Sequence, residues 1–93
     1  MSVTMVLPGQ LRDLARGRAR VDLETDPATV ADALGALRAR LPAVYERLVT
    51  EEGNVRAHVN LFVGADDIRW SGGLDTPVPA GAEIVVIPSV SGG

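Results

Sequence analysis

The sequence predicts an α+β fold in which a mixed sheet of four to five strands is crossed by one main helix. Three patterns predict it. Apolar and polar residues alternate in three places, which is the period of a half-buried strand. One segment carries apolar residues at helical spacing. Finally, the β-branched run from Ile84 to Ile87 is too short for a helix and apolar on both faces, which predicts a buried strand.

Composition limits what the chain can be. With 93 residues, of which 46% are hydrophobic, it is the size of one small domain with a core of its own. It contains no cysteine and one histidine, His58. Disulfides, thiolate metal sites and cysteine nucleophiles are therefore excluded, and no metal site is expected.

The charge is acidic and unevenly distributed. A net charge of −3 argues against a nucleic-acid partner, because proteins that bind nucleic acids usually have a basic surface. Residues 1–47 hold seven Arg against six acids, whereas residues 48–93 hold two Arg against six acids. The acidic second half would either suit a basic partner surface or be an ordinary solubilising surface. No segment is apolar enough to span a bilayer, and the chain begins with a strand pattern rather than a signal peptide, so we expect a cytoplasmic protein without a membrane partner.

The first elements form a predicted hairpin. Residues 2–7 alternate as a strand, and residues 10–17 form a polar connection with one helical turn around Leu11 and Leu14. Residues 18–23 resume the alternation. We expect these two strands to pair antiparallel across the long loop.

The main helix follows. Either Asp26, with Pro27 as the first helical residue, or Thr29 is a good N-cap. Pro42 ends the helix, and residues 43–49 briefly resume it. The helical stripe that would cover the sheet consists of Val30, Leu34, Leu37 and Leu41.

A long alternating strand is predicted over residues 55–63, with Phe62, Asn60 and His58 on its outer face. A large apolar residue on that face indicates either a partner surface or a covered satellite cluster. Asn60 and His58 are expected to be solvated or interfacial rather than catalytic.

A short strand near residues 68–70 and a turn at residues 71–73 precede the last strand, which Pro88 ends. The turn lacks the Lys and the following helix of a phosphate loop. Because a helix separates the second and third strands, and the last strand is the most apolar, the last strand is expected between the first and the third. That arrangement is a β-grasp, or ubiquitin-like, fold. We expect it to span residues 1–88, with a flexible tail at 89–93.

Four stretches resemble the ThiS/MoaD family of ubiquitin-like sulfur carrier proteins. They are TVADALGAL, VNLFVG, DDIRWSGGLDTPVPAGAEIVVIP and the closing VSGG, so that the resemblance covers nearly the whole chain. The DIRWSGGLDTPV part is most similar to the CysO type, which serves cysteine biosynthesis.

The resemblance implies a co-substrate rather than an enzyme. A ubiquitin-activating-type adenylyltransferase would use ATP to adenylate the Gly93 carboxylate, and a sulfur donor would then leave a thiocarboxylate there. The client would be a cysteine synthase-like, thiazole synthase-like or molybdopterin synthase-like enzyme. No cofactor would be bound stably, since the sulfur is carried covalently at Gly93.

The resemblance also assigns the remaining site residues. Gly92 and Gly93 would remove bulk and admit unusual backbone angles where the tail enters an active site. Val90 would anchor the tail in an apolar groove, and Ser91 would bond to the groove backbone. The partner interface would consist of Phe62, Asn60 and Pro88.

Two other functions remain open. The chain could be a β-grasp interaction module with an inert tail, or a protein modifier joined to lysines of other proteins through Gly93. All nine basic side chains are Arg and none is Lys, which favours a carrier over a tag that builds chains on itself. An enzyme is disfavoured, because the sequence offers no cysteine and no serine in a nucleophile-elbow setting.

Overall fold

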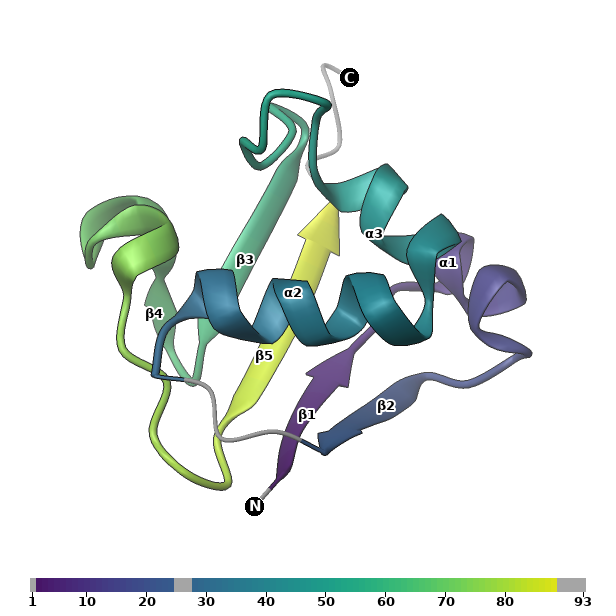
Figure 1. The fold of residues 1–93 in the computed structure, drawn as a ribbon, viewed down its shortest axis with the longest axis horizontal. Coiled ribbons are helices and arrows are strands. Elements are labelled where there is room, and N and C mark those ends of the chain that lie inside the picture. Colours follow the sequence, from purple (N-terminus) through teal and green to yellow (C-terminus); the bar gives the residue numbers. More distant parts are fainter. Residues whose placement is uncertain (1, 25–27, 89–93) are drawn as a thin grey trace.

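The computed structural model describes residues 2–24 and 28–88, which form a five-stranded sheet covered on one face by helices (Figure 1). The sheet order is β2-β1-β5-β3-β4. The strands are β1 (Ser2–Val6), β2 (Arg20–Glu24), β3 (Val59–Val63), β4 (Asp66–Asp67) and β5 (Glu83–Pro88). The α-helices are α1 (Gly9–Arg12), α2 (Val30–Arg40) and α3 (Pro42–Leu48), and short 3₁₀ helices span Asp13–Ala15, Ile68–Trp70 and Gly73–Asp75.

The topology confirms the β-grasp prediction. β1 and β2 pair antiparallel, with Met5 opposite Val21. β5 lies between β1 and β3, parallel to the first and antiparallel to the second. Helix α2 runs across the middle of the sheet, as predicted for the main helix (Figure 1).

The sequence explains where α2 begins and which face it buries. Thr29 and Asp32 form a capping box, in which the Thr29 hydroxyl accepts from the Asp32 N–H and the Asp32 carboxylate accepts from the Thr29 N–H. Of the predicted caps, Asp26 and Pro27 lie outside the described residues. The predicted stripe packs into the core, joined by Ala33, and the helix stops before Pro42, which opens α3.

The core lies between α2, α3 and the inner face of the sheet. Its largest fully buried side chains are Met5, Leu7, Leu23, Leu37, Leu48, Leu61 and Ile84. No helix in the described part of the chain is long and apolar enough to cross a membrane.

The predicted strand over residues 55–63 is too long, since β3 begins only at Val59. Val55 instead forms an isolated bridge with Val49. The Arg56 N–H donates to the Leu48 carbonyl at 2.9 Å, and the Val59 N–H donates back to the Arg56 carbonyl at 3.0 Å. These bonds fold residues 55–58 into a turn beside α3, although their polarity alternates as in a strand.

The strand predicted near residues 68–70 is also wrong, because that segment is a 3₁₀ helix and the short strand β4 precedes it at Asp66–Asp67. The Asp67 carboxylate accepts from the Arg69 backbone N–H at 2.9 Å. This cap stabilises a helical turn and stops the strand.

The last strand is central, as predicted, but it is buried on one face only. Ile84 and Val86 are 0% and 4% exposed, whereas Val85 is half-buried and Ile87 is 44% exposed. The reason is that the helices cover a single face of the sheet. The last described pair of β5 joins Pro88 to Val59 of β3.

Candidate functional site

The face of the sheet away from the helices carries an apolar row across its three central strands. Val6 and Phe62 both pair with Val85 in the strand register, and Ile87 lies farther along β5 opposite Asn60. We call Val6, Phe62, Val85 and Ile87 the open-face patch. Phe62 is half-buried and belongs neither to the buried core nor to the half-buried side chains packed against it.

The open face becomes polar toward β2. Thr4 donates through its hydroxyl to the Asp22 carboxylate at 2.8 Å. Arg20 forms an ion pair with Glu83 at the start of β5. The open-face patch is therefore bordered on one side by charged and hydroxyl groups, an apolar centre with a polar rim of the kind that protein-protein interfaces also have.

The candidate tail begins where β5 ends. Val90, Ser91, Gly92 and Gly93 lie outside the described residues, so Pro88 is the tail-proximal site residue that the structure places. Pro88 is half-buried and lines a recess of about 210 Å³ whose other walls are Pro8, Gln10, Leu11, Arg47, Leu48, His58, Val59 and Val86.

The structure brings two of the three predicted interface residues to one face. Phe62 and Asn60 are two residues apart on the open face of β3, whereas Pro88, at the end of the adjacent β5, pairs with the inward-facing Val59 and shares the parity of Ile84 and Val86, so it lies on the helix side of the sheet. His58 is exposed in the turn before β3, which agrees with its prediction as solvated or interfacial.

The turn after β4 contains an ion pair whose two partners have shifted pKa values. The resolved effect is at Asp67, where hydrogen bonds from the Arg69 side chain and backbone hold the pKa of the carboxyl below its ordinary value. The same ion pair, at 3.0 Å, raises the pKa of Arg69. Both groups stabilise the turn after β4. Within residues 2–24 and 28–88, no three His, Asp or Glu side chains gather as metal ligands would.

Two exposed apolar residues were missed from the sequence. Ile87 was included in a strand expected to be buried on both faces, although it shares the parity of the outward Val85. Trp70 is 84% exposed because it ends a 3₁₀ helix rather than a strand. Parity along β5 would have revealed Ile87, whereas only the Asp67 cap signals the position of Trp70.

Comparison with known proteins identifies the family. The model of the ThiS family matches residues 5–93 of this chain. The chain belongs to the ThiS family. The sulfur carrier protein CysO of Mycobacterium tuberculosis is 33% identical over 95 residues, covering 100% of both chains.

Solved structures of ThiS-like proteins agree with the fold. The structure titled as the Amycolatopsis orientalis BexX/CysO complex contains a chain that superposes with a TM-score of 0.85 at 34% identity, covering 98% of this chain and 99% of that one. The small archaeal modifier protein 1 of Haloferax volcanii is 36% identical over 74 residues, covering 80% of this chain and 79% of the relative. This ThiS-family chain is thus similar both to sulfur carriers and to a protein modifier.

Proposed function

We propose that this ThiS-family protein is a sulfur carrier whose Gly93 carboxylate is converted to a thiocarboxylate. The observation that carries the proposal is the family match, which runs through residue 93 and so includes Gly92-Gly93. The full-length similarity to the sulfur carrier CysO supports it. The protein acts as a co-substrate and holds no stable cofactor.

The chemistry takes two steps. In the first, a carboxylate oxygen of Gly93 attacks the α-phosphate of ATP, forming an acyl-adenylate and releasing pyrophosphate. In the second, a sulfide sulfur attacks the acyl carbon and AMP leaves with the electron pair of the broken C–O bond. Adenylation is needed because a carboxylate is a poor electrophile with no good leaving group. The thiocarboxylate that results is the nucleophile a client enzyme uses.

The fold supplies a rigid base for the proposed tail, residues 89–93. β5 pairs with β1 from Glu83 to Val85 and with β3 from Ile84 to Pro88. The tail therefore leaves from a strand that cannot shift without breaking the centre of the sheet. Fixing this base limits the positions that the proposed reactive group must search.

We assign the open-face patch as the docking surface for the activating enzyme, an adenylyltransferase of the ubiquitin-activating type. Phe62 is a large, partly exposed side chain at the middle of the sheet, flanked by Val85 and Asn60. Aromatic side chains at the centre of an interface contribute most of its binding energy. The client is an enzyme that accepts sulfur for cysteine or a sulfur-containing cofactor or metabolite.

The test is an intact-mass measurement on the full chain incubated with such an activating enzyme, ATP and sulfide. We expect a species in which one oxygen of Gly93 is replaced by sulfur, located by fragmentation of the tail. A chain lacking Gly93 is the matched control and should remain unmodified. If the full chain also stays unmodified with an enzyme that loads the CysO relative, the proposal is wrong.

A second function is favoured by the similarity to the small archaeal modifier protein 1. In this case the activated Gly93 would form an amide with a lysine of another protein. The chain contains no lysine, so it cannot be extended into chains of itself through side-chain amines. Isopeptide-linked tail fragments in digests of cell extract would establish this function, and their absence from cells that accumulate the thiocarboxylate would leave the carrier function alone.

A further inference from the structure

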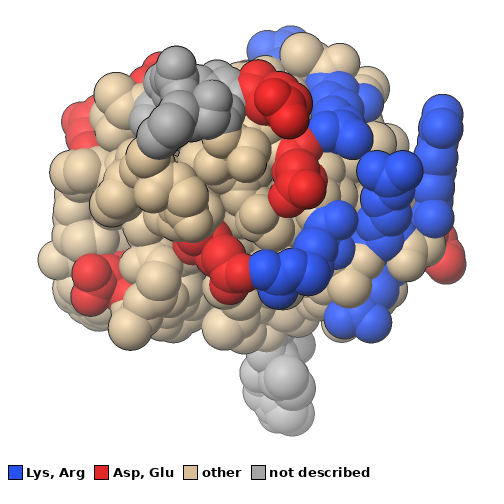
Figure 2. Space-filling model, turned by 90° about the horizontal axis from the view of Figure 1, so that it is seen from below, with Lys and Arg blue, Asp and Glu red and all other residues tan. Residues whose placement is uncertain are grey.

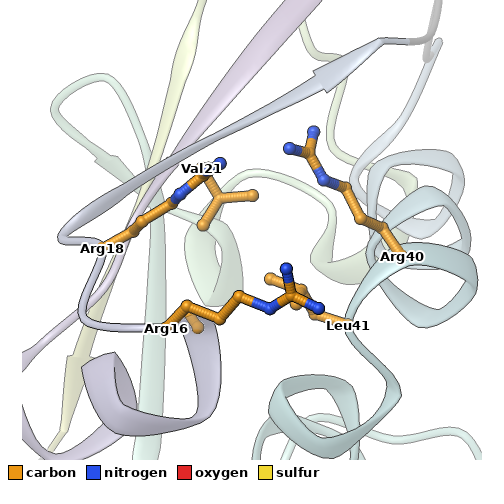
Figure 3. Close-up of a pocket in the computed structure, with 6 residues that line it drawn as sticks. Arg16, Arg18, Val21, Arg40 and Leu41 are labelled. Atoms are coloured by element: carbon orange, nitrogen blue, oxygen red, sulfur yellow. The ribbon is translucent and has the colours of Figure 1, made fainter.

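A pocket of arginines lies away from the open-face patch. Space-filling shows arginine side chains gathered on one side of the molecule (Figure 2). There a cavity of about 210 Å³ is lined by Arg16, Arg18 and Arg40 over a floor of Ala15, Val21 and Leu41. Figure 3 shows Arg16 and Arg40 entering the cavity from opposite sides, with the Arg16 guanidinium beside Leu41 and the Arg40 guanidinium pointing toward β2. We call this cavity the arginine pocket.

Two segments of the chain, the loop before β2 and the end of α2, place these guanidinium groups together. Arg16 follows the 3₁₀ helix Asp13–Ala15, Arg18 precedes β2, and Arg40 is the last residue of α2. Arg40 also donates to the Asp22 backbone carbonyl, which ties the end of α2 to β2. The convergence is therefore built by the tertiary fold and is not a run of charge along one helix.

Described acids do not neutralise the arginine pocket. Within residues 2–24 and 28–88 the ion pairs are those of Arg20 with Glu83 and Arg69 with Asp67, and neither involves a pocket residue. Three neighbouring guanidinium groups repel one another, and an anion between them removes that cost.

The backbone conformation of Arg16 is a second indication of a functional site. Arg16 has φ = 58°, the one positive φ among the described residues that are not glycine. Gly or Asn adopts this left-handed conformation at lower cost than Arg. A long cationic side chain therefore occupies a strained position from which it extends over the pocket, and such outliers cluster at functional positions.

We propose that the arginine pocket binds a carboxylate side chain presented by an acidic segment of a partner protein. A guanidinium group pairs with a carboxylate through two parallel hydrogen bonds, and the apolar floor suits the methylene carbons of a Glu. A phosphate is disfavoured because the pocket lies beside the C-terminus of α2, whose partial negative charge repels a dianion more than a monoanion. The proposal does not depend on the sulfur chemistry of Gly93.

The test is a titration of the isotopically labelled full chain with a blocked tetraglutamate peptide at low salt, followed by amide chemical shifts. We expect the amide signals of Arg16, Gly17, Arg18 and Leu41 to shift. These shifts should disappear at high salt, because added ions screen the attraction between the arginines and the peptide. A tetraglutamine peptide and inorganic phosphate are the parallel probes. Equal or tighter binding of phosphate, or shifts spread evenly over the surface, would overturn the proposal.

Variants then distinguish binding at the arginine pocket from a nonspecific effect of the net charge. Arg16→Asn removes one guanidinium while keeping a residue that tolerates positive φ, and Arg18→Gln is a second variant at a position without backbone strain. Each should weaken tetraglutamate binding by about twofold to fivefold, the range of a solvent-exposed ion pair. Arg47→Gln changes the net charge equally but lies in α3 outside the arginine pocket. Equal weakening by Arg47→Gln would refute a specific site.

Discussion

The two faces of the sheet differ sharply although the same strands build both. On the inner face Met5, Leu61 and Ile84 are at most 1% exposed under the helices. On the open face their neighbours Val6, Phe62 and Val85 are only half-buried, and Ile87 is 44% exposed. The inner face accounts for the stability of the fold.

The open face calls for a different explanation. β5 carries β-branched residues at four successive positions, of which only Ile84 and Val86 contribute to the core. The outward pair, Val85 and Ile87, stays in contact with water and continues the apolar row of Phe62. Apolar surface left open at the centre of a sheet, beside the strand that leads into the tail, is consistent with a partner covering it.

The largest effect on stability should come from a substitution on the inner face. Leu34→Ala is expected to lower the free energy of unfolding by about 2–5 kcal/mol, because Leu34 is 3% exposed in the core. The adjacent Gly35 is exposed in α2, and a Cβ there would meet nothing within 4 Å. Gly35→Ala should therefore raise stability by about 0.5–1 kcal/mol. Chemical denaturation measures both, and equal effects at the two positions would mean that α2 packs differently.

The next effect concerns the open face. Phe62→Ala should weaken docking of the activating enzyme by about tenfold, near 1.4 kcal/mol, as expected for an aromatic side chain at the centre of an interface. Its cost in stability should be only about 1 kcal/mol, since Phe62 is half-buried. Binding and thermal unfolding are measured on the same protein. Unchanged docking with a folded variant would remove the open-face patch from the proposed interface.

A smaller effect is expected at the start of α2. Thr29→Ala removes the hydroxyl that accepts from the Asp32 N–H, and should cost about 1 kcal/mol of stability. Thr29→Asn keeps an acceptor at the cap and serves as the matched control. If both variants lose the same stability, the side-chain cap contributes nothing and α2 is held on the inner face by packing alone.

The smallest effect is pH-dependent. The pKa of Asp67 is lowered in the folded protein by its bonds with Arg69, so the ionised carboxylate stabilises the fold above the ordinary pKa of about 4, and this contribution disappears as pH falls through the folded pKa. Asp67→Asn keeps an acceptor for the Arg69 N–H but loses the charge. The midpoint temperature of thermal unfolding should fall slightly less steeply from neutral to acid pH for the variant than for the unchanged protein. An identical pH profile would show that the pair is fully screened.

Much of the fold follows from periodicity in the sequence. The hairpin of β1 and β2, the buried stripe of α2 and the central position of β5 were all predictable, because burial on one face leaves a regular pattern. Residues 55–58 and 68–70 were mistaken for strand, since their structure depends on single hydrogen bonds. The Arg56 N–H finds a carbonyl in α3, and the Asp67 carboxylate caps a turn.

The candidate site divides in the same way. Phe62 can be proposed from the sequence because it interrupts a polar face, and Gly92-Gly93 can be proposed because two small residues follow the strand pattern; both stay predictions. The arginine pocket is not evident from the sequence, because Arg40 is far along the chain from Arg16 and Arg18 and only the packed fold brings it beside them. Arg16 in a left-handed conformation has no signature in composition or spacing.

The central place of β5 has a consequence for the synthesis of the protein. β5 is the last of the described strands to be synthesised, yet it joins β1 to β3, and without it the described sheet separates into two pairs of strands with exposed edges. The packed inner face of the sheet therefore cannot form on the ribosome until residues 83–88 have left the exit tunnel. A nascent chain that stops short stays unfolded and open to proteolysis, so folded molecules all retain the strand from which the proposed tail extends.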